Sequence, residues 1–379
     1  MKRPTSSVVR LHALILTLSA ASLGFTWPWE VGGPWPSSSK VPVQRLDHPA
    51  LEQAAVAEDG RVRFAAYGDQ RALADGEWQA MIAQIAAVHA QDRLDFIVDT
   101  GDIVQDGQYS DQYWMLREIL APVGELPLLV GVGNHEVRNN KVQQARDNTG
   151  TFLGYLDPEF SSARMYYRKD AGPVRFLFLD SNDLAYGEEA TSPPNRVEAQ
   201  MRWLAQELEA SRSWTGPLVV VLHHPFLQSS RKHLETAVYL WSYRPRGPEK
   251  PPFPELLLDA GVDLVLVGHT HTYERFVLEK GGRSMDLVNL SGRPRTAILW
   301  IGDGARRARD IAGKEVERLR AQGWRDLEGW SISQESVMLD EEENQFAIFE
   351  ATDSTLTMSV RFLGEDRGAM RDSVTILTW

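Results

Sequence analysis

The stretch VDLVLVGHTH (residues 262–271) joins an almost continuous apolar run to a glycine and two histidines. A short apolar run of this kind is typical of a buried β-strand. Residues alternate between the two faces of an extended chain, so the side chains of His269 and His271 can point the same way. On its own, the stretch is compatible with ligation, with stacking on a sheet face, or with two histidines that have no function.

The same arrangement, an apolar run that ends near a glycine and a polar residue, recurs along the chain. Strands are predicted at residues 62–69, 95–102, 126–136, 174–182, 217–225, 262–271 and 296–304. Helical patterns lie between several of them, around residues 75–91, 110–121, 196–211 and 252–260. This alternation predicts a mixed α/β fold whose sheet is covered by helices. After about residue 305, alternating residues predict an antiparallel hairpin that closes the second half of the sheet system.

The composition excludes several classes of site. The chain has 379 residues and a formal net charge of −12, which gives no support to a broad nucleic-acid surface. It contains no cysteine, so disulfides, thiolate nucleophiles and sulfur-ligated metals are excluded. Small molecules are the expected partners, and the oligomeric state is left open.

The first residues have the pattern of an export signal. Residues 1–10 begin with Lys and Arg, and an apolar stretch follows that ends among small residues. We expect residues 1–25 to be a signal peptide or an uncleaved signal anchor, residues 26–60 to be a linker rich in Pro, Gly and Trp, and residues 61–379 to be the folded domain. The folded part is then exported to a periplasmic or extracellular space, and membrane contact is expected only through an uncleaved N-terminal segment.

Metal-competent residues stand where the predicted strands end. They are Asp69, Asp102, Asn134 with His135, His223 with His224, and His269 with His271. In open α/β sheets, ligands bind beyond the carboxyl ends of the strands, so these residues are expected to converge. Two carboxylates brought together repel each other unless a cation lies between them. Carboxylates and imidazoles suit zinc, iron or manganese, and the ordered set predicts a site for one or two such ions.

This ordered set resembles the calcineurin-like metallophosphoesterase superfamily, and GHTHTYER (residues 268–275) is similar to the last motif of its purple acid phosphatases. The resemblance spans about residues 61–304. It implies a β-sandwich of two mixed sheets flanked by helices, with the active site at the carboxyl ends of the strands and two metal ions (Fe, Mn or Zn). It further implies Asp69 and His271 on one metal, Asn134, His223 and His269 on the other, and Asp102 as the bridge. His135 would stay off the metals and donate a proton to the leaving oxygen.

Two positions depart from the family pattern. Most members have a histidine two residues after the first aspartate, where this chain has Arg71. Purple acid phosphatases have a tyrosine three residues after the second aspartate, where this chain has Gln105. Gln70, Gln105 or Asp106 are open as replacement ligands, and Arg71 is expected to reach the substrate phosphate, which arginine binds well. The first metal should therefore be the more exchangeable one.

The sequence thus predicts a metal-dependent hydrolase that cleaves a phosphomonoester or phosphodiester by in-line attack of a metal-bound hydroxide. The alternative is a degenerate family member that binds a phosphorylated ligand without turnover, because one metal site lacks its usual extra ligand. A third class, a structural protein of the cell envelope, would bind no metal at all. The natural substrate is left open.

Overall fold

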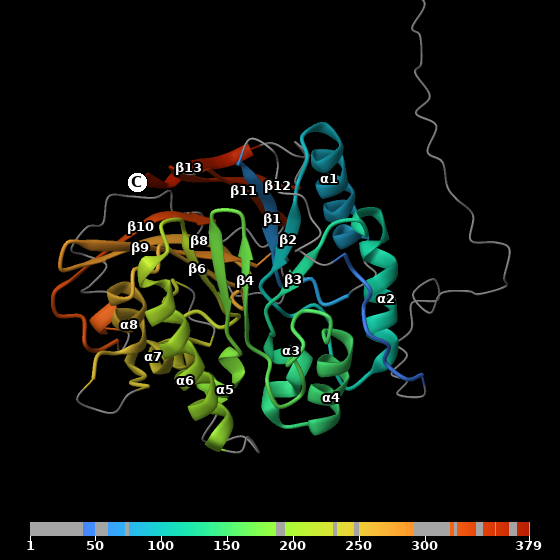
Figure 1. The fold of residues 1–379 in the computed structure, drawn as a ribbon, viewed down its shortest axis with the longest axis horizontal. Coiled ribbons are helices and arrows are strands. Elements are labelled where there is room, and N and C mark those ends of the chain that lie inside the picture. Colours follow the sequence, from blue (N-terminus) through green and yellow to red (C-terminus); the bar gives the residue numbers. More distant parts are fainter. Residues whose placement is uncertain are drawn as a thin grey trace, which may run out of the picture. The chain divides into compact units, whose positions relative to one another are not determined.

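Two mixed β-sheets pack against each other at the centre of the computed structural model (Figure 1). The structure describes residues 41–49, 60–72, 76–186, 194–229, 233–245, 250–291, 319–321, 324–338, 344–352, 354–363 and 370–378. All of these belong to one unit, residues 38–379. The predicted signal segment 1–25 and the predicted strand 296–304 lie outside the described residues.

The first sheet has the strand order β13-β12-β11-β1-β2-β3. Its strands are β1 (Val62–Tyr67), β2 (Phe96–Asp99), β3 (Leu128–Val130), β11 (Gln345–Ala351), β12 (Thr355–Phe362) and β13 (Met370–Thr378). Strands β1, β2 and β3 are parallel, whereas β11 pairs antiparallel with β1. The hairpin expected after residue 305 is therefore present as β11 and β12. The expectation that it closes the second half of the sheet system was wrong, because it extends the first sheet beside β1.

The second sheet has the strand order β10-β8-β9-β7-β6-β5-β4. Its strands are β4 (Tyr167–Ala171), β5 (Val174–Phe178), β6 (Leu218–Val221), β7 (Leu264–Val267), β8 (Tyr273–Lys280), β9 (Arg283–Leu290) and β10 (Trp330–Met338). Strands β5, β6, β7 and β9 are parallel, and the others pair antiparallel. Both sheets are mixed, as the resemblance implied.

Helices cover the outer faces of the two sheets (Figure 1). They are α1 (Glu77–Gln91), α2 (Ser110–Leu120), α3 (Asn134–Val137), α4 (Gln143–Phe152), α5 (Ser181–Tyr186), α6 (Pro194–Ala210), α7 (Leu234–Ser242) and α8 (Phe253–Asp259). Helices α1 and α2 share a core with the first sheet, and α6, α7 and α8 share one with the second. Among the described residues, no helix has the length and apolar character needed to cross a membrane.

Aromatic side chains fill the space between the sheets. The rings of Phe64 and Phe96 in the first sheet stack 4.9 Å apart, and both meet the edge of Phe176 in the second sheet, at 5.4 and 5.7 Å. Such edge-to-face contacts are favourable beyond the area they bury. This packing fixes the two sheets relative to each other and so brings their strand ends together.

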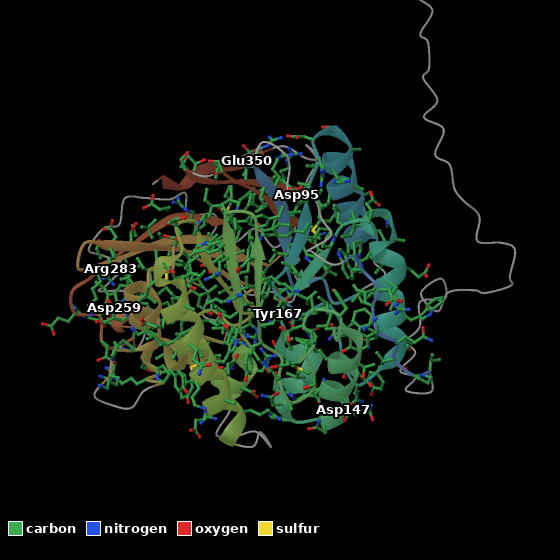
Figure 2. The ribbon with its side chains drawn as sticks, in the orientation of Figure 1. Asp95, Asp147, Tyr167, Asp259, Arg283 and Glu350 are labelled. Carbon is green, nitrogen blue, oxygen red and sulfur yellow. The ribbon has the colours of Figure 1, made fainter. Side chains whose placement is uncertain are left out.

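Strand β3 is at the edge of its sheet, and the hydroxyls of two tyrosines, Tyr167 (labelled in Figure 2) and Tyr155, satisfy backbone groups along it. The Tyr167 hydroxyl, from β4 of the other sheet, donates to the carbonyl of Val130 and accepts from the Val130 N–H, both at 2.9 Å. The Tyr155 hydroxyl donates to the carbonyl of Leu128 at 2.9 Å. An unpaired backbone group costs free energy when buried, and these hydroxyls remove that cost.

Part of the predicted linker packs on the domain. Leu46 is buried in the core of the first sheet, and its N–H donates to the carbonyl of Phe152 at 2.9 Å. The nearby His48 ring bonds through Nδ1 to the carbonyl of Leu126 at 2.9 Å. Tertiary packing thus extends upstream of Arg61.

Candidate metal centre

The side chains predicted to bind metal come together from the ends of strands in both sheets. They are Asp69, Asp102 and Asn134 after β1, β2 and β3, and His223, His269 and His271 after β6 and β7. Five of them are buried and Asn134 is partly buried. One oxygen of Asp69, one of Asp102 and one nitrogen of His223 lie within 4.8 Å of one another. The site therefore lies where the carboxyl ends of the two sets of parallel strands meet, as the sequence predicted.

The contacts of His223 are those of a metal ligand. Its Nδ1 lies 3.1 Å from the carbonyl oxygen of Thr100, which can only accept, so Nδ1 carries a hydrogen. In the neutral ring, Nε2 then presents a lone pair. That atom lies 3.2 Å from Asn134 Oδ1 and 3.3 Å from Asp102 Oδ1, which are acceptors as well. These atoms can lie so close only with a positive charge among them, which is either a proton on Nε2 or a metal ion, and the imidazole, carboxylate and amide oxygen are a donor set that a metal ion fits.

His269 and His271 complete the cluster from the second sheet. The backbone N–H of His269 donates to Asp69 Oδ2 at 2.8 Å, and its ring lies 5.1 Å from the ring of His223. His271 Nε2 is 3.7 Å from Asp69 Oδ1, an oxygen that accepts no hydrogen bond from the described residues. Asp69 and His271, the pair predicted for the first metal, are thus neighbours, as are the residues predicted for the second.

The backbone at the site is strained in a way that identifies it as functional. Asp69, Arg71, Asp102, His269 and His271 all have left-handed backbone conformations, with φ between 59° and 74°. Residues other than glycine seldom adopt this region, at a cost of about 1–3 kcal/mol each, and such strain clusters at active sites. The turn after each strand therefore aims its side chain back across the strand ends.

Burial and charge act in opposite directions on the central carboxylate. Burial raises the pKa of Asp102, but His223, His135 and Arg71 lower it by more, and the pKa lies well below its usual value. The backbone N–H of His135 also donates to Asp102 Oδ1 at 2.9 Å. Asp102 is therefore an ionised carboxylate in the middle of the cluster, which is the state a bridging ligand needs.

The residues fit a metal at the second of the two predicted positions and not at the first. At the second, Asp102, Asn134, His223 and His269 provide two oxygens and two imidazoles. At the first, Arg71 Nη2 lies 3.1 Å from Asp102 Oδ2 and 3.0 Å from His271 Nε2. The Arg71 guanidinium, which was expected to reach the substrate phosphate, contacts two of the three ligands predicted for the first metal.

His135 lies beside the cluster in an orientation suited to proton transfer. Its Nδ1 lies 2.5 Å from the backbone carbonyl of Gln105, so this nitrogen carries a hydrogen. The opposite nitrogen, Nε2, lies 3.8 Å from Asp102 Oδ2. The ring is therefore fixed with Nε2 toward the site, and its side chain is 18% exposed.

The three residues considered as replacement ligands have different surroundings. Gln105 serves the site through its backbone carbonyl. Asp106 accepts from the N–H of Gln108 at 3.1 Å and forms an ion pair with Arg138 at 3.3 Å. The amide of Gln70 is buried without a hydrogen-bond partner among the described residues.

Glu136, which the sequence analysis did not assign, holds the two ligand loops of the first sheet together. Its carboxylate accepts hydrogen bonds from the N–H groups of Asp102 at 2.8 Å, Val104 at 3.0 Å and Gly133 at 2.7 Å. Burial and the neighbouring Asp102 raise the pKa of Glu136 to about 8, against these three donors. A Cβ at Gly133 would lie 2.2 Å from Asp102 Oδ1, so only glycine fits between the loops.

We expect Glu136→Gln to loosen this connection. The amide nitrogen that replaces one carboxylate oxygen would face a backbone N–H. That N–H would lose its acceptor, at a cost of about 1–3 kcal/mol. Thermal unfolding and metal titration should show lower stability and weaker metal binding. Glu118→Gln, on the exposed side of α2, is the control and should change neither. Unchanged metal affinity in Glu136→Gln would show that the loops hold their positions without it.

Two further histidines lie against the cluster. His224 is buried, its Nδ1 lies 2.8 Å from the hydroxyl of Ser181, and burial together with His223 lowers its pKa well below the usual value. It is therefore a neutral packing partner. His233 precedes α7 and places its ring 4.5 Å from the ring of His269. Its spacing in the sequence carried no signal of this contact.

Comparison with known proteins shows to which family the chain belongs. The model of the calcineurin-like phosphoesterase family matches residues 62–273, more than half of the chain. Purple acid phosphatase 15 of Arabidopsis thaliana is 32% identical over 155 residues, which are 40% of this chain and 25% of that protein. Purple acid phosphatase 22 of the same plant is 26% identical over 253 residues, 65% of this chain and 51% of that protein. The matches thus span about half, or less, of these relatives.

Solved structures share the fold at lower identity. A purple acid phosphatase from yellow lupin (Lupinus luteus) seeds superimposes with a TM-score of 0.54 at 17% identity, covering 86% of this chain and 55% of that one. GAP50, the anchor in the inner membrane complex of Plasmodium, gives a TM-score of 0.55 at 16% identity, covering 84% and 89%. The fold, the converging strand-end residues and the family match agree, and the chain belongs to the calcineurin-like phosphoesterase family.

Proposed function

We propose that this protein is a metal-dependent hydrolase that cleaves a phosphomonoester or phosphodiester. The observation that carries the proposal is the group of acceptors around His223 Nε2, because the oxygens of Asn134 and Asp102 face its lone pair at 3.2 and 3.3 Å. Membership of the calcineurin-like phosphoesterase family supports a metal ion among these acceptors and a phosphoester as the substrate. The reaction we propose is in-line displacement by water, with no covalent enzyme intermediate.

The metal and the protein have separate tasks in this reaction. When bound, the metal supplies a Lewis acid that polarises a phosphoryl oxygen and lowers the pKa of water near it. Asp102, Asn134, His223 and His269 would hold the ion. His135 acts as an imidazolium, whose Nδ1–H is held by the Gln105 carbonyl and whose Nε2–H is given to the leaving oxygen, which leaves the ring neutral. Each role follows from an orientation that the surrounding backbone sets.

The second candidate is a binding protein that holds a phosphorylated ligand without turnover. The contact of Arg71 with two predicted ligands of the first metal favours it, because one metal position differs from the family pattern. A fold hosts different functions, and one protein that shares this fold is described as an anchor. Only a measurement of turnover separates the two candidates.

The test is hydrolysis of p-nitrophenyl phosphate and of bis-p-nitrophenyl phosphate by the purified protein loaded with Mn²⁺, Zn²⁺ or iron. We expect turnover of at least one ester, loss of turnover after chelation, and recovery when metal is added back. Tight metal binding without turnover of either ester would favour the binding protein. Elemental analysis that finds no metal after loading would contradict both candidates.

We also propose export, with the mature domain in a periplasmic or extracellular space. The charged start and apolar stretch within residues 1–25 support this. N-terminal sequencing of the mature protein distinguishes a cleaved signal from an anchor.

A further inference from the structure

Arg71 is held inside the cluster and does not extend toward solvent. Its backbone N–H donates to the carbonyl of Asp102 at 2.8 Å, and its φ of 59° turns the side chain back over the strand ends. The side chain is 16% exposed, and its Nε is buried. The guanidinium is therefore fixed at the site by the same turn that presents Asp69.

One nitrogen of Arg71 contacts two of the side chains that were predicted to bind the first metal. Nη2 has two hydrogens; it lies 3.1 Å from Asp102 Oδ2 and 3.0 Å from His271 Nε2. A guanidinium is always a donor, so His271 Nε2 must be the acceptor in this contact. The lone pair of Nε2 is then engaged by the N–H and is not available to a metal ion.

Arg71 also supplies the positive charge that the carboxylates at the first metal position need. Asp69 and Asp102 are buried carboxylates at adjacent strand ends, and carboxylates so placed need a positive charge near them. Arg71 forms an ion pair with Asp102. The family resemblance puts a histidine ligand at this position; an arginine supplies a permanent charge there and offers no lone pair.

We propose that the Arg71 guanidinium takes the place of the first metal, so that each chain holds one metal ion, at Asp102, Asn134, His223 and His269. Asp69 and His271 then position the guanidinium and the loops and do not coordinate. The inference rests on the proposed function only in requiring that the second position bind metal. A substrate would then bind beside one exchangeable metal ion and the guanidinium of Arg71.

The test is metal content per chain. The wild-type protein, Arg71→His and Arg71→Met are loaded with Mn²⁺ or Zn²⁺, desalted and measured by elemental analysis. We expect about one equivalent in the wild type and about two in Arg71→His, because the imidazole adds a ligand and frees His271 Nε2. Arg71→Met also frees that lone pair without adding a ligand, so it should take up a second, weaker equivalent at high metal concentration. In Mn²⁺-loaded Arg71→His, the electron paramagnetic resonance spectrum should show coupling between neighbouring ions that the wild type lacks.

Arg93→His is the matched control, because Arg93 is half exposed on the loop after α1 and bonds to Asp95. It should keep one equivalent. Two equivalents in the wild type, or one in both Arg71 variants, would overturn the proposal. If stoichiometry changes as expected but no phosphoester is hydrolysed, the inference stands and the proposed function fails. If no form binds metal, both fail.

Discussion

Asp102→Ala is expected to remove both metal binding and turnover. Asp102 faces His223 Nε2 with one oxygen and Arg71 with the other, and its first oxygen also accepts from the His135 N–H. Without it, the ion loses its central anionic ligand, which corresponds to a loss of activity of at least about a thousandfold. Arg71 would also lose its partner inside the protein, and breaking such a buried pair costs about 3–5 kcal/mol of stability.

Activity, metal content and thermal unfolding should be measured together on Asp102→Ala and Asp102→Asn. The asparagine variant keeps the shape and removes the charge, so it separates loss of fold from loss of the ligand. Asp106→Ala is the control in the same loop, since Asp106 bonds to Gln108 and Arg138 outside the cluster. Full metal content in a folded Asp102→Asn would refute a central role for this carboxylate.

His135→Ala is expected to lower turnover by about a hundredfold to ten-thousandfold while metal content stays close to that of the wild type. The side chain contacts the Gln105 carbonyl on one side and approaches Asp102 Oδ2 on the other, whereas His223 Nε2 faces Oδ1 of that carboxylate. Its loss therefore removes a proton donor and leaves the ion in place.

The leaving group provides the sharpest measurement of this role. p-Nitrophenolate leaves readily without a proton, whereas an alkoxide does not, so His135→Ala should impair an alkyl phosphate far more than p-nitrophenyl phosphate. His48→Ala is the control, because the His48 ring bonds to a backbone carbonyl in the same way at a distant position. An equal loss on both substrates, or a loss of metal equal to that of Asp102→Ala, would contradict proton donation by His135.

The sequence predicted the parallel strands and the positions of the site residues because one physical pattern encodes both. A strand buried on two faces must be apolar throughout, and the chain can carry polar side chains only where the strand ends. Parallel neighbours end at the same edge, so Asp69 and Asp102 were expected together, and β1 and β2 are indeed adjacent and parallel. The residue types then indicated a metal.

The antiparallel hairpin of β8 and β9, inside the second sheet, was harder to predict. Strands β8 and β9 were missed, although Gly281 and Gly282, both with positive φ, form the two-residue turn typical of a hairpin. Helix α3 covers only Asn134–Val137, which is too short for a helical pattern to show. Such elements depend on partners far away in the chain, and local sequence says little about them.

The contacts of Arg71 could not be read from the sequence either. Its position, two residues after Asp69, showed which residue stands where a histidine is usual. It did not show whether a long side chain turns inward to Asp102 or outward to a substrate, because that depends on a backbone φ of 59° that an arginine seldom adopts. The same is true of His233, which reaches His269 from a segment with no strand or motif to place it.

The two tyrosine hydroxyls on β3 have a consequence for the behaviour of the protein in solution. An open strand edge is a template on which another chain can add a strand, and this is a common start of aggregation. Tyr167 occupies both backbone groups of Val130, and Tyr155 the carbonyl of Leu128. These three backbone groups on β3 are bonded to side chains of the same chain, so another strand could pair with them only by displacing the two tyrosine hydroxyls.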